Sequence, residues 1–129
     1  MATWEDLRAY VRETYTVSED TGELLTLLFN VSGERKQWAY VTRTRTGGGL
    51  DFATIASPFA TVGTIDLEGA LHELREYVVG GVATYGDLYV VRHAVLLETI
   101  NTAEFEVPLR LVLGAADALE SQFAGSDLF

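Results

Sequence analysis

The chain has 129 residues, a length that suits one domain with a substantial core and is too short for two. Hydrophobic residues make up 48% of it and charged residues 22%, which is the composition of a folded globular protein rather than a disordered one. The 19 acidic residues outnumber the 9 basic ones and give a net charge of −10, which disfavours binding to nucleic acids and to anionic membranes.

The sequence lacks cysteine, and it lacks the patterns of a signal peptide and of a membrane-spanning segment. The chain contains no cysteine, which excludes disulfides, thiolate nucleophiles and cysteine-ligated metals. The first residues lack the basic flank and apolar core of a signal peptide, and no run reaches the roughly 18 apolar residues that span a bilayer. We therefore expect a cytoplasmic protein that does not insert into membranes.

The N-terminal half predicts one helix and three strands. Thr3 is a typical N-cap, and apolar residues then recur at helical spacing at Trp4, Leu7, Val11 and Tyr15. An acidic loop is expected over residues 18–23, followed by strands over 24–31 and 37–46 that are joined by a turn at 32–35. Glycines 47–49 are expected to end the second strand, and a third strand is expected over 50–56. Pro58 is expected to end this strand, because proline has no amide hydrogen for the ladder.

The C-terminal half predicts two helices with two strands between them. Asp66 caps a helix that Gly80-Gly81 ends, with an apolar face of Leu67, Leu71, Leu74 and Val78. Strands are expected over 82–85 and 88–97. Asn101 or Thr102 caps the last helix, whose apolar stripe consists of Phe105, Leu109, Val112, Ala116, Leu119 and Phe123. Pro108 conflicts with a start near residue 103, so a kink and a later start both remain open.

The predicted order of elements is α-β-β-β-α-β-β-α. Short loops favour antiparallel pairing of neighbouring strands, so we expect a five-stranded antiparallel sheet. Helices then cover one face, which gives a two-layer α+β sandwich. The domain is expected to span residues 1–123, with residues 124–129 as a short C-terminal tail.

Several segments in the last part of the chain resemble one known family. They are Gly80–Asp87, Arg92–Glu98, Glu104-Phe105, Pro108-Leu109 and the pattern Ala116-Asp117-x-Leu119-Glu120. Together they resemble actinobacterial members of the type III secretion chaperone-like/YbjN superfamily, and the length and element order fit over essentially the whole domain. Such sequences often carry proline between Val95 and Leu97, where this chain has Leu96. The resemblance implies a small α+β domain that binds peptides or partner proteins, often as a homodimer, without catalytic residues.

Candidate binding residues lie on two of the expected strands. Arg92 and His93 are adjacent and therefore point to opposite faces, so one of them faces the core or an interface, where a charge needs a partner. Two interpretations stay open: an anchor for a bound peptide, or an internal ion pair with the nearby acids Glu98, Asp117 and Glu120. On the second strand we expect Trp38, Tyr40 and Arg43 to contact a peptide, with Arg92 as the polar anchor.

No pattern in the sequence carries convincing catalytic or metal-binding chemistry. His72 has Glu68 and Glu76 four residues away on either side, which is more typical of a solvated helix face than of a metal site. Glycines 47–49 lack the Lys-Ser/Thr pair of a phosphate-binding loop, and Ser57 lies between Ala56 and Pro58 rather than in a nucleophile elbow. We therefore expect neither an enzyme nor a bound cofactor or metal.

The function that we expect is a non-catalytic protein- or peptide-binding module of chaperone type. It would bury an apolar partner segment by strand addition at a sheet edge or in a groove between helix and sheet. Two other functions fit the same pattern. One is a small-molecule-binding or enzymatic α+β domain with a cavity between helix and sheet. The other is a structural module that forms a homodimer.

Overall fold

The computed structural model describes residues 3–32, 35–78 and 81–124. The helices are α1 (Trp4–Thr14), α2 (Leu67–Leu74) and α3 (Thr102–Leu119), the last continued by a π-helical turn η1 (Glu120–Ala124). The strands are β1 (Val17–Asp20), β2 (Leu24–Ser32), β3 (Arg35–Arg45), β4 (Asp51–Thr61), β5 (Gly81–Tyr85) and β6 (Leu88–Leu96). Residues 33–34, Gly80 and most of the expected tail, 125–129, lie outside the described residues.

The strands form one antiparallel sheet in the order β1-β2-β3-β4-β6-β5. The α+β class is therefore confirmed, whereas the prediction of five strands is wrong because the described chain forms six. The additional strand is β1, which occupies part of the expected acidic loop. Val17 packs against the core there, and the carboxylate of Asp20 is paired with arginines of α1, so contacts with the core and with the preceding helix hold this acidic segment in place.

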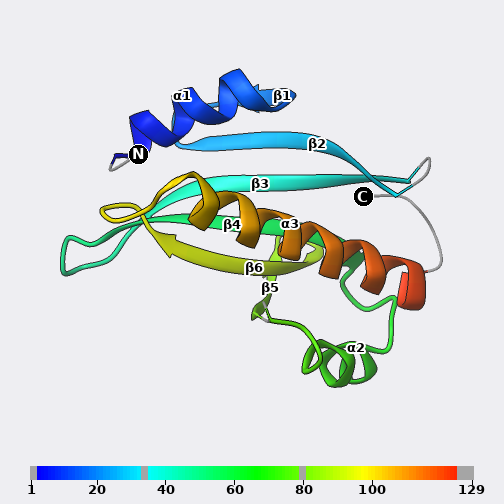
Figure 1. Cartoon of the computed structure of the whole chain (residues 1–129). Helices are drawn as coiled ribbons and strands as arrows, with labels where there is room; N and C mark the ends of the chain where they lie inside the picture. The colour runs from blue at the N-terminus through cyan, green and yellow to red at the C-terminus, as the bar shows by residue number, and fades with distance from the viewer. Residues whose placement is uncertain (1–2, 33–34, 79–80, 125–129) are drawn as a thin grey trace.

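Helices α1 and α3 pack on the same face of the sheet (Figure 1). Thr3 accepts a hydrogen bond from the amide of Asp6, which begins α1 as predicted. The core between helices and sheet consists mainly of Trp4, Leu7, Val11, Leu25, Leu27, Ile55, Phe59, Phe105, Leu109, Val112 and Leu119, all almost completely buried. Helix α2 lies apart from α1 and α3, beyond β5 and β6 in Figure 1.

Helix α3 resolves the conflict that Pro108 raised. Asn101 and Glu104 form a capping box, so the helix begins at Thr102 and contains the proline. The predicted apolar stripe is buried from Phe105 to Leu119, and Phe123 packs partly against the core. Burial of this stripe outweighs the backbone hydrogen bond that Pro108 cannot donate.

Helix α2 differs from the prediction in its buried face. Asp66 caps the helix as expected, but the helix ends at Leu74, and Val78 beyond it is 87% exposed. Leu71 is 48% exposed, whereas Ala70 and Leu74 are buried. The predicted face of four residues is therefore only partly correct, because the short helix contacts the core through a narrower strip.

Pro58 does not end the sheet, and the expected boundary there is wrong. The register Tyr40↔Ala56, continued by two residues, places Pro58 opposite Trp38 at a hydrogen-bonded position of the ladder. The Ser57 hydroxyl donates to the carbonyl of Trp38 at 2.5 Å, in place of the amide hydrogen that proline lacks. The buried side chain of Gln37 donates to Ser57 Oγ at 2.9 Å and to the Pro58 carbonyl at 2.6 Å. Side chains thus replace the missing ladder contact.

Candidate functional site

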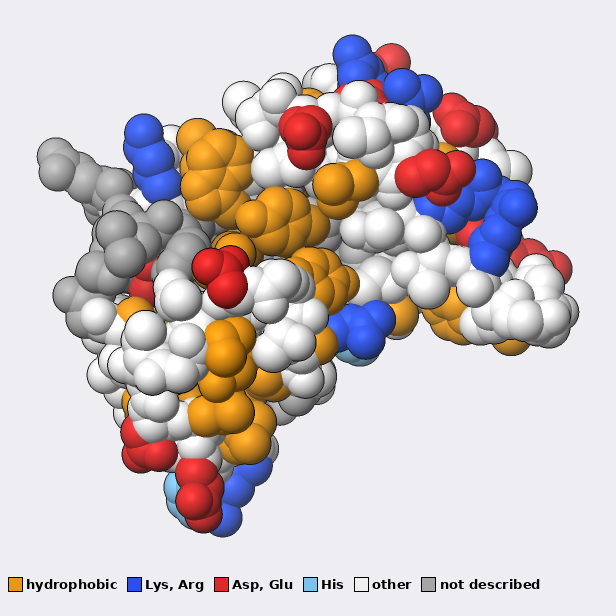
Figure 2. Space-filling view, turned by 180° about the vertical axis from the view of Figure 1, so that it is seen from behind, with side chains coloured by type: hydrophobic (Ala, Val, Ile, Leu, Met, Phe, Trp, Pro, Cys, Tyr) orange, Lys and Arg blue, Asp and Glu red, His pale blue; other side chains and the backbone are white. Residues whose placement is uncertain are grey.

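The face of the sheet opposite α1 and α3 carries three of the four residues expected to bind a peptide. Side chains alternate along each strand, which places Trp38, Tyr40 and Arg92 on this open face. The same face includes Leu24, Leu28, Thr42, Ala56, Tyr85 and Leu88. Figure 2 shows hydrophobic side chains gathered along a hollowed band of the molecule seen from this side.

The open face is concave around two tyrosines. The rings of Tyr40 and Tyr85 are stacked, with centroids 6.4 Å apart and planes inclined by 30°. Their strands, β3 and β5, are separated by β4 and β6, so on a flat sheet they would lie about 14 Å apart. The sheet therefore curves around this face. The tyrosines line a shallow pocket of about 290 Å³ together with Leu24, Thr42 and Leu88. Burial raises the pKa of Tyr40, with a smaller effect of Glu19.

Arg92 lies on the open face beside the outer strand. Its Nε atom is buried and has no hydrogen-bond partner among the described residues. Gly81 is directly opposite, where a Cβ atom would lie 3.0 Å from the Arg92 carbonyl oxygen, so glycine permits the close approach of the two strands. Arg92 points away from α3, and the described residues show no ion pair between it and the acids of that helix. Asp117 accepts a hydrogen bond from Arg35 at 2.8 Å instead. His93 is half-buried on the opposite face.

The fourth expected residue, Arg43, lies on the helix-bearing face and is not brought together with the other three. Its guanidinium forms a bidentate contact with Asp51 at 2.9 to 3.2 Å and approaches Glu23 at 4.0 Å. This contact joins β3 to β4 at the end of the sheet. Arg43 is therefore engaged within the fold.

A second concave surface lies on the helix-bearing face, between β2 and α3. We call it the β2–α3 groove; its volume is about 560 Å³ and it is lined by Tyr15, Phe29, Asn30, Val31, Glu106, Leu109, Arg110, Leu113 and Gly114. Tyr10 and Tyr15 both donate hydrogen bonds to Oε1 of Glu106. These bonds lower the pKa of Glu106, while burial and the carboxylate raise the pKa of both tyrosines. The carboxylate is thus held ionised beside apolar walls.

Sequence reasoning did not identify the β2–α3 groove. Tyr10 and Tyr15 are more than 90 residues away from Glu106 along the chain, and no local spacing connects them. Tyr15 was recognised only as part of the apolar stripe of the first helix. The one available signal was Gly114, a glycine inside an otherwise regular helical pattern.

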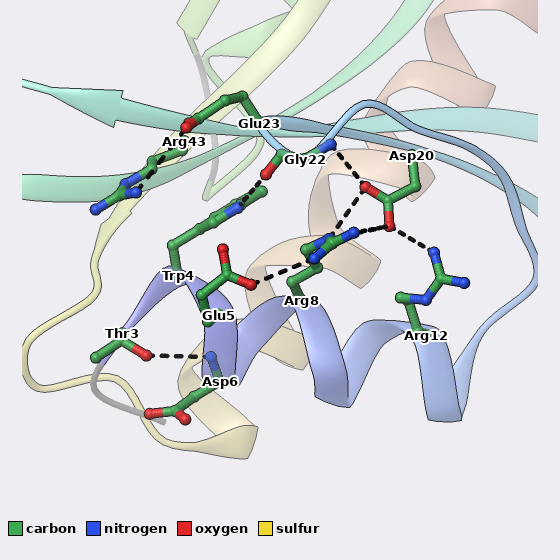
Figure 3. Close-up of polar contacts among 10 residues, drawn as sticks. All are labelled: Thr3, Trp4, Glu5, Asp6, Arg8, Arg12, Asp20, Gly22, Glu23 and Arg43. Atoms are coloured by element: carbon green, nitrogen blue, oxygen red, sulfur yellow. Dashed lines mark hydrogen bonds and ion pairs between the residues drawn. The ribbon is translucent and has the colours of Figure 1, made fainter.

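The polar contacts between α1 and the segment after it have a structural role (Figure 3). Asp20 accepts hydrogen bonds from Arg8, Arg12 and the amide of Gly22, which lower the pKa of its carboxyl to about 2. The indole of Trp4 donates to the Gly22 carbonyl at 2.6 Å. Gly22 has a φ of +94°, a conformation that favours glycine. This network fixes the end of β1 against α1.

The described residues contain no group of three or more histidine, aspartate or glutamate side chains that could hold a metal ion. His72 lies exposed on α2, as the sequence suggested. Of the helices in the described part of the chain, none combines the length and apolarity needed to cross a membrane.

Comparisons of the chain with protein-family models, with curated proteins and with solved structures gave no match.

Proposed function

We propose that the chain is a protein- or peptide-binding module that buries an apolar partner segment against its open face. The observation that carries this proposal is the concave, aromatic surface around Tyr40 and Tyr85, on the side of the sheet away from α1 and α3. Large, rigid aromatic side chains at the centre of a surface are typical of binding hot spots. The resemblance to secretion chaperones, whose matching segments include Tyr85 and Arg92, supports the same function.

One polar atom of the open face, Nε of Arg92, indicates which chemical group the partner must provide. The Nε–H group of Arg92 is buried without an acceptor among the described residues, and an unpaired buried donor is unfavourable. A small movement of the Arg92 side chain on binding would expose this donor to a partner carbonyl or carboxylate, which would accept its hydrogen bond. The partner segment is therefore apolar along most of its length and contributes an oxygen acceptor beside Arg92.

A screen of immobilised peptides tests this function. Peptides that bind the purified parent protein are measured against the double variant Tyr40→Ser/Tyr85→Ser and against Leu71→Ser, which removes an exposed leucine from α2. We expect binding to fall at least tenfold in the double variant and to stay unchanged in Leu71→Ser, with melting temperatures showing that both fold.

Spectroscopy locates the bound peptide independently of these variants. The chain has two tryptophans, Trp4 in the core and Trp38 on the open face, so it gives two indole N–H resonances. A bound peptide is expected to shift the Trp38 resonance and leave that of Trp4 in place. Equal binding by all variants, with no shift at Trp38, contradicts the proposal. A dimer in solution that the double variant abolishes would assign the open face to a second copy of the chain instead.

A further inference from the structure

Strand β2 is longer than its outer neighbour β1, which leaves part of its edge unpaired. The register Val17↔Leu27 is the last pair of the two strands, and the amide of Leu28 reaches the Thr16 carbonyl at 3.4 Å. Beyond this point the described chain places no strand beside β2, although β2 continues to Ser32 (Figure 1). An unpaired strand edge is a template for another extended chain.

The direction of the backbone groups follows from the bonds that β2 makes elsewhere. Odd-numbered residues of β2 bond to β3, as shown by Arg43 N–H donating to the carbonyl of Glu23 just before the strand. Even-numbered residues face the outer side, as the bond from Thr21 to the Leu24 carbonyl shows. The carbonyl of Leu28 and both backbone groups of Asn30 therefore point outward, and Asn30 is exposed.

The β2–α3 groove adjoins this same edge. Phe29, Asn30 and Val31 line it, and the side chains of Phe29 and Val31 face α3. A strand added beside β2 would place every second side chain on the face occupied by the groove. Backbone pairing and side-chain burial are thus available together around Asn30, between the position of Thr16 opposite Leu28 and the shift of register before Ser32.

We propose that this edge is a second binding site, which takes an extended peptide antiparallel to β2 and in line with β1. The peptide carries apolar side chains at alternate positions, which enter the β2–α3 groove, and has a net positive charge. The charge follows from the net −10 of the chain as a whole, since Glu106 lies beside Arg110 in the groove itself. A second copy of the chain is a poor occupant, because two molecules of this charge repel each other. The site lies away from the open face and does not depend on the function proposed for it.

Protein variants separate backbone pairing from side-chain contacts. Asn30→Pro removes the outward amide hydrogen at an edge position where proline is tolerated, and Asn30→Ala is its control. Gly114→Trp fills the groove, whereas Gly114→Ala adds only a methyl group where nothing lies within 4 Å. The probe is the capped heptapeptide acetyl-Val-Lys-Val-Thr-Val-Lys-Val-amide, titrated by calorimetry. We expect saturable binding to the parent and both alanine variants, and at least tenfold weaker binding to Asn30→Pro and Gly114→Trp.

Methylated peptides test the same geometry without altering the protein. In the proposed register one of these lysine or threonine residues lies opposite Asn30, because Thr16 already lies opposite Leu28. The lysine and threonine amides therefore face β2, while the valine amides point away. N-methylation of the lysine and threonine amides is expected to abolish binding, and N-methylation of the two internal valines to preserve it. Failure of the parent to bind the heptapeptide at millimolar concentration, or equal losses from both methylation patterns, overturns the proposal. Neither result bears on the open face, whose variants leave this edge unchanged.

Discussion

We expect the hydroxyl of Ser57 to contribute more to the free energy of unfolding than the hydroxyl of an ordinary buried serine. The reason is that it donates the hydrogen bond that the backbone of Pro58 cannot donate. In Ser57→Ala the carbonyl of Trp38 faces Pro58 without a hydrogen, and Gln37 loses one of its two acceptors. Leaving a buried acceptor unpaired costs about 1–3 kcal/mol. Such a loss is a large part of the roughly 5–15 kcal/mol that stabilises a typical domain.

A double-mutant cycle with Pro58→Ala tests the cause of this loss. Alanine at position 58 restores an amide hydrogen opposite Trp38, so Ser57→Ala should cost less in the Pro58→Ala background. We expect a coupling of about 1 kcal/mol or more, in the range found for residues that share a hydrogen-bond network. Urea unfolding monitored by circular dichroism gives the four free energies of unfolding. If the two substitutions are additive, the Ser57 hydroxyl does not replace the proline amide and the reasoning is refuted.

Three further substitutions test other parts of the structure. Asp20→Asn should lower the free energy of unfolding at pH 7, because the folded-state pKa of Asp20, about 2, lies below its usual 3.8. The difference from the parent should shrink as the pH falls from about 4 towards 2, and a difference independent of pH would contradict this. Gly114→Ala should raise the free energy of unfolding by about 0.8–1 kcal/mol, since its methyl group meets open space in a helix; a lower melting temperature would contradict it. Arg92→Met should stabilise the free protein by removing an unpaired donor, while weakening any peptide that binds the open face; lower stability would show that Arg92 is satisfied.

The helices α1 and α3 were predictable because their signals are local. A cap and an apolar stripe at helical spacing lie within one segment, and burial from Phe105 to Leu119 follows from that stripe. Strand β1 and the continuation of β4 through Pro58 were not predictable in this way. Each depends on side-chain contacts with another element, the α1 arginines for β1 and Gln37 of β3 for β4. Sequence patterns indicate which secondary structure a segment prefers by itself. Strand β1 and the part of β4 beyond Pro58 form although their own sequences favour a loop and a strand end.

The open face was predictable in part. Alternation along a strand put Trp38 and Tyr40 together and separated Arg92 from His93, and the register agrees with both. Curvature of the sheet has no such signal, so the contact of Tyr40 with Tyr85 was not foreseen. The carboxylate of Glu106 and its two phenols were missed for the same reason, since three elements far apart in sequence meet there.

The two proposed binding surfaces, the open face and the outer edge of β2, have a common origin. The sheet is larger than the area that the helices cover. Helices α1 and α3 pack on a single face, so apolar residues on the other face can be buried only by curvature or by a partner. On this face Ala56 and Val90 are completely buried, whereas Tyr40 and Tyr85 line a pocket that is open to the surface. At the edge, β1 ends while β2 continues, so backbone groups and the groove remain open there together. The uncovered face and the uncovered edge are therefore the two places where the proposed peptides would bind.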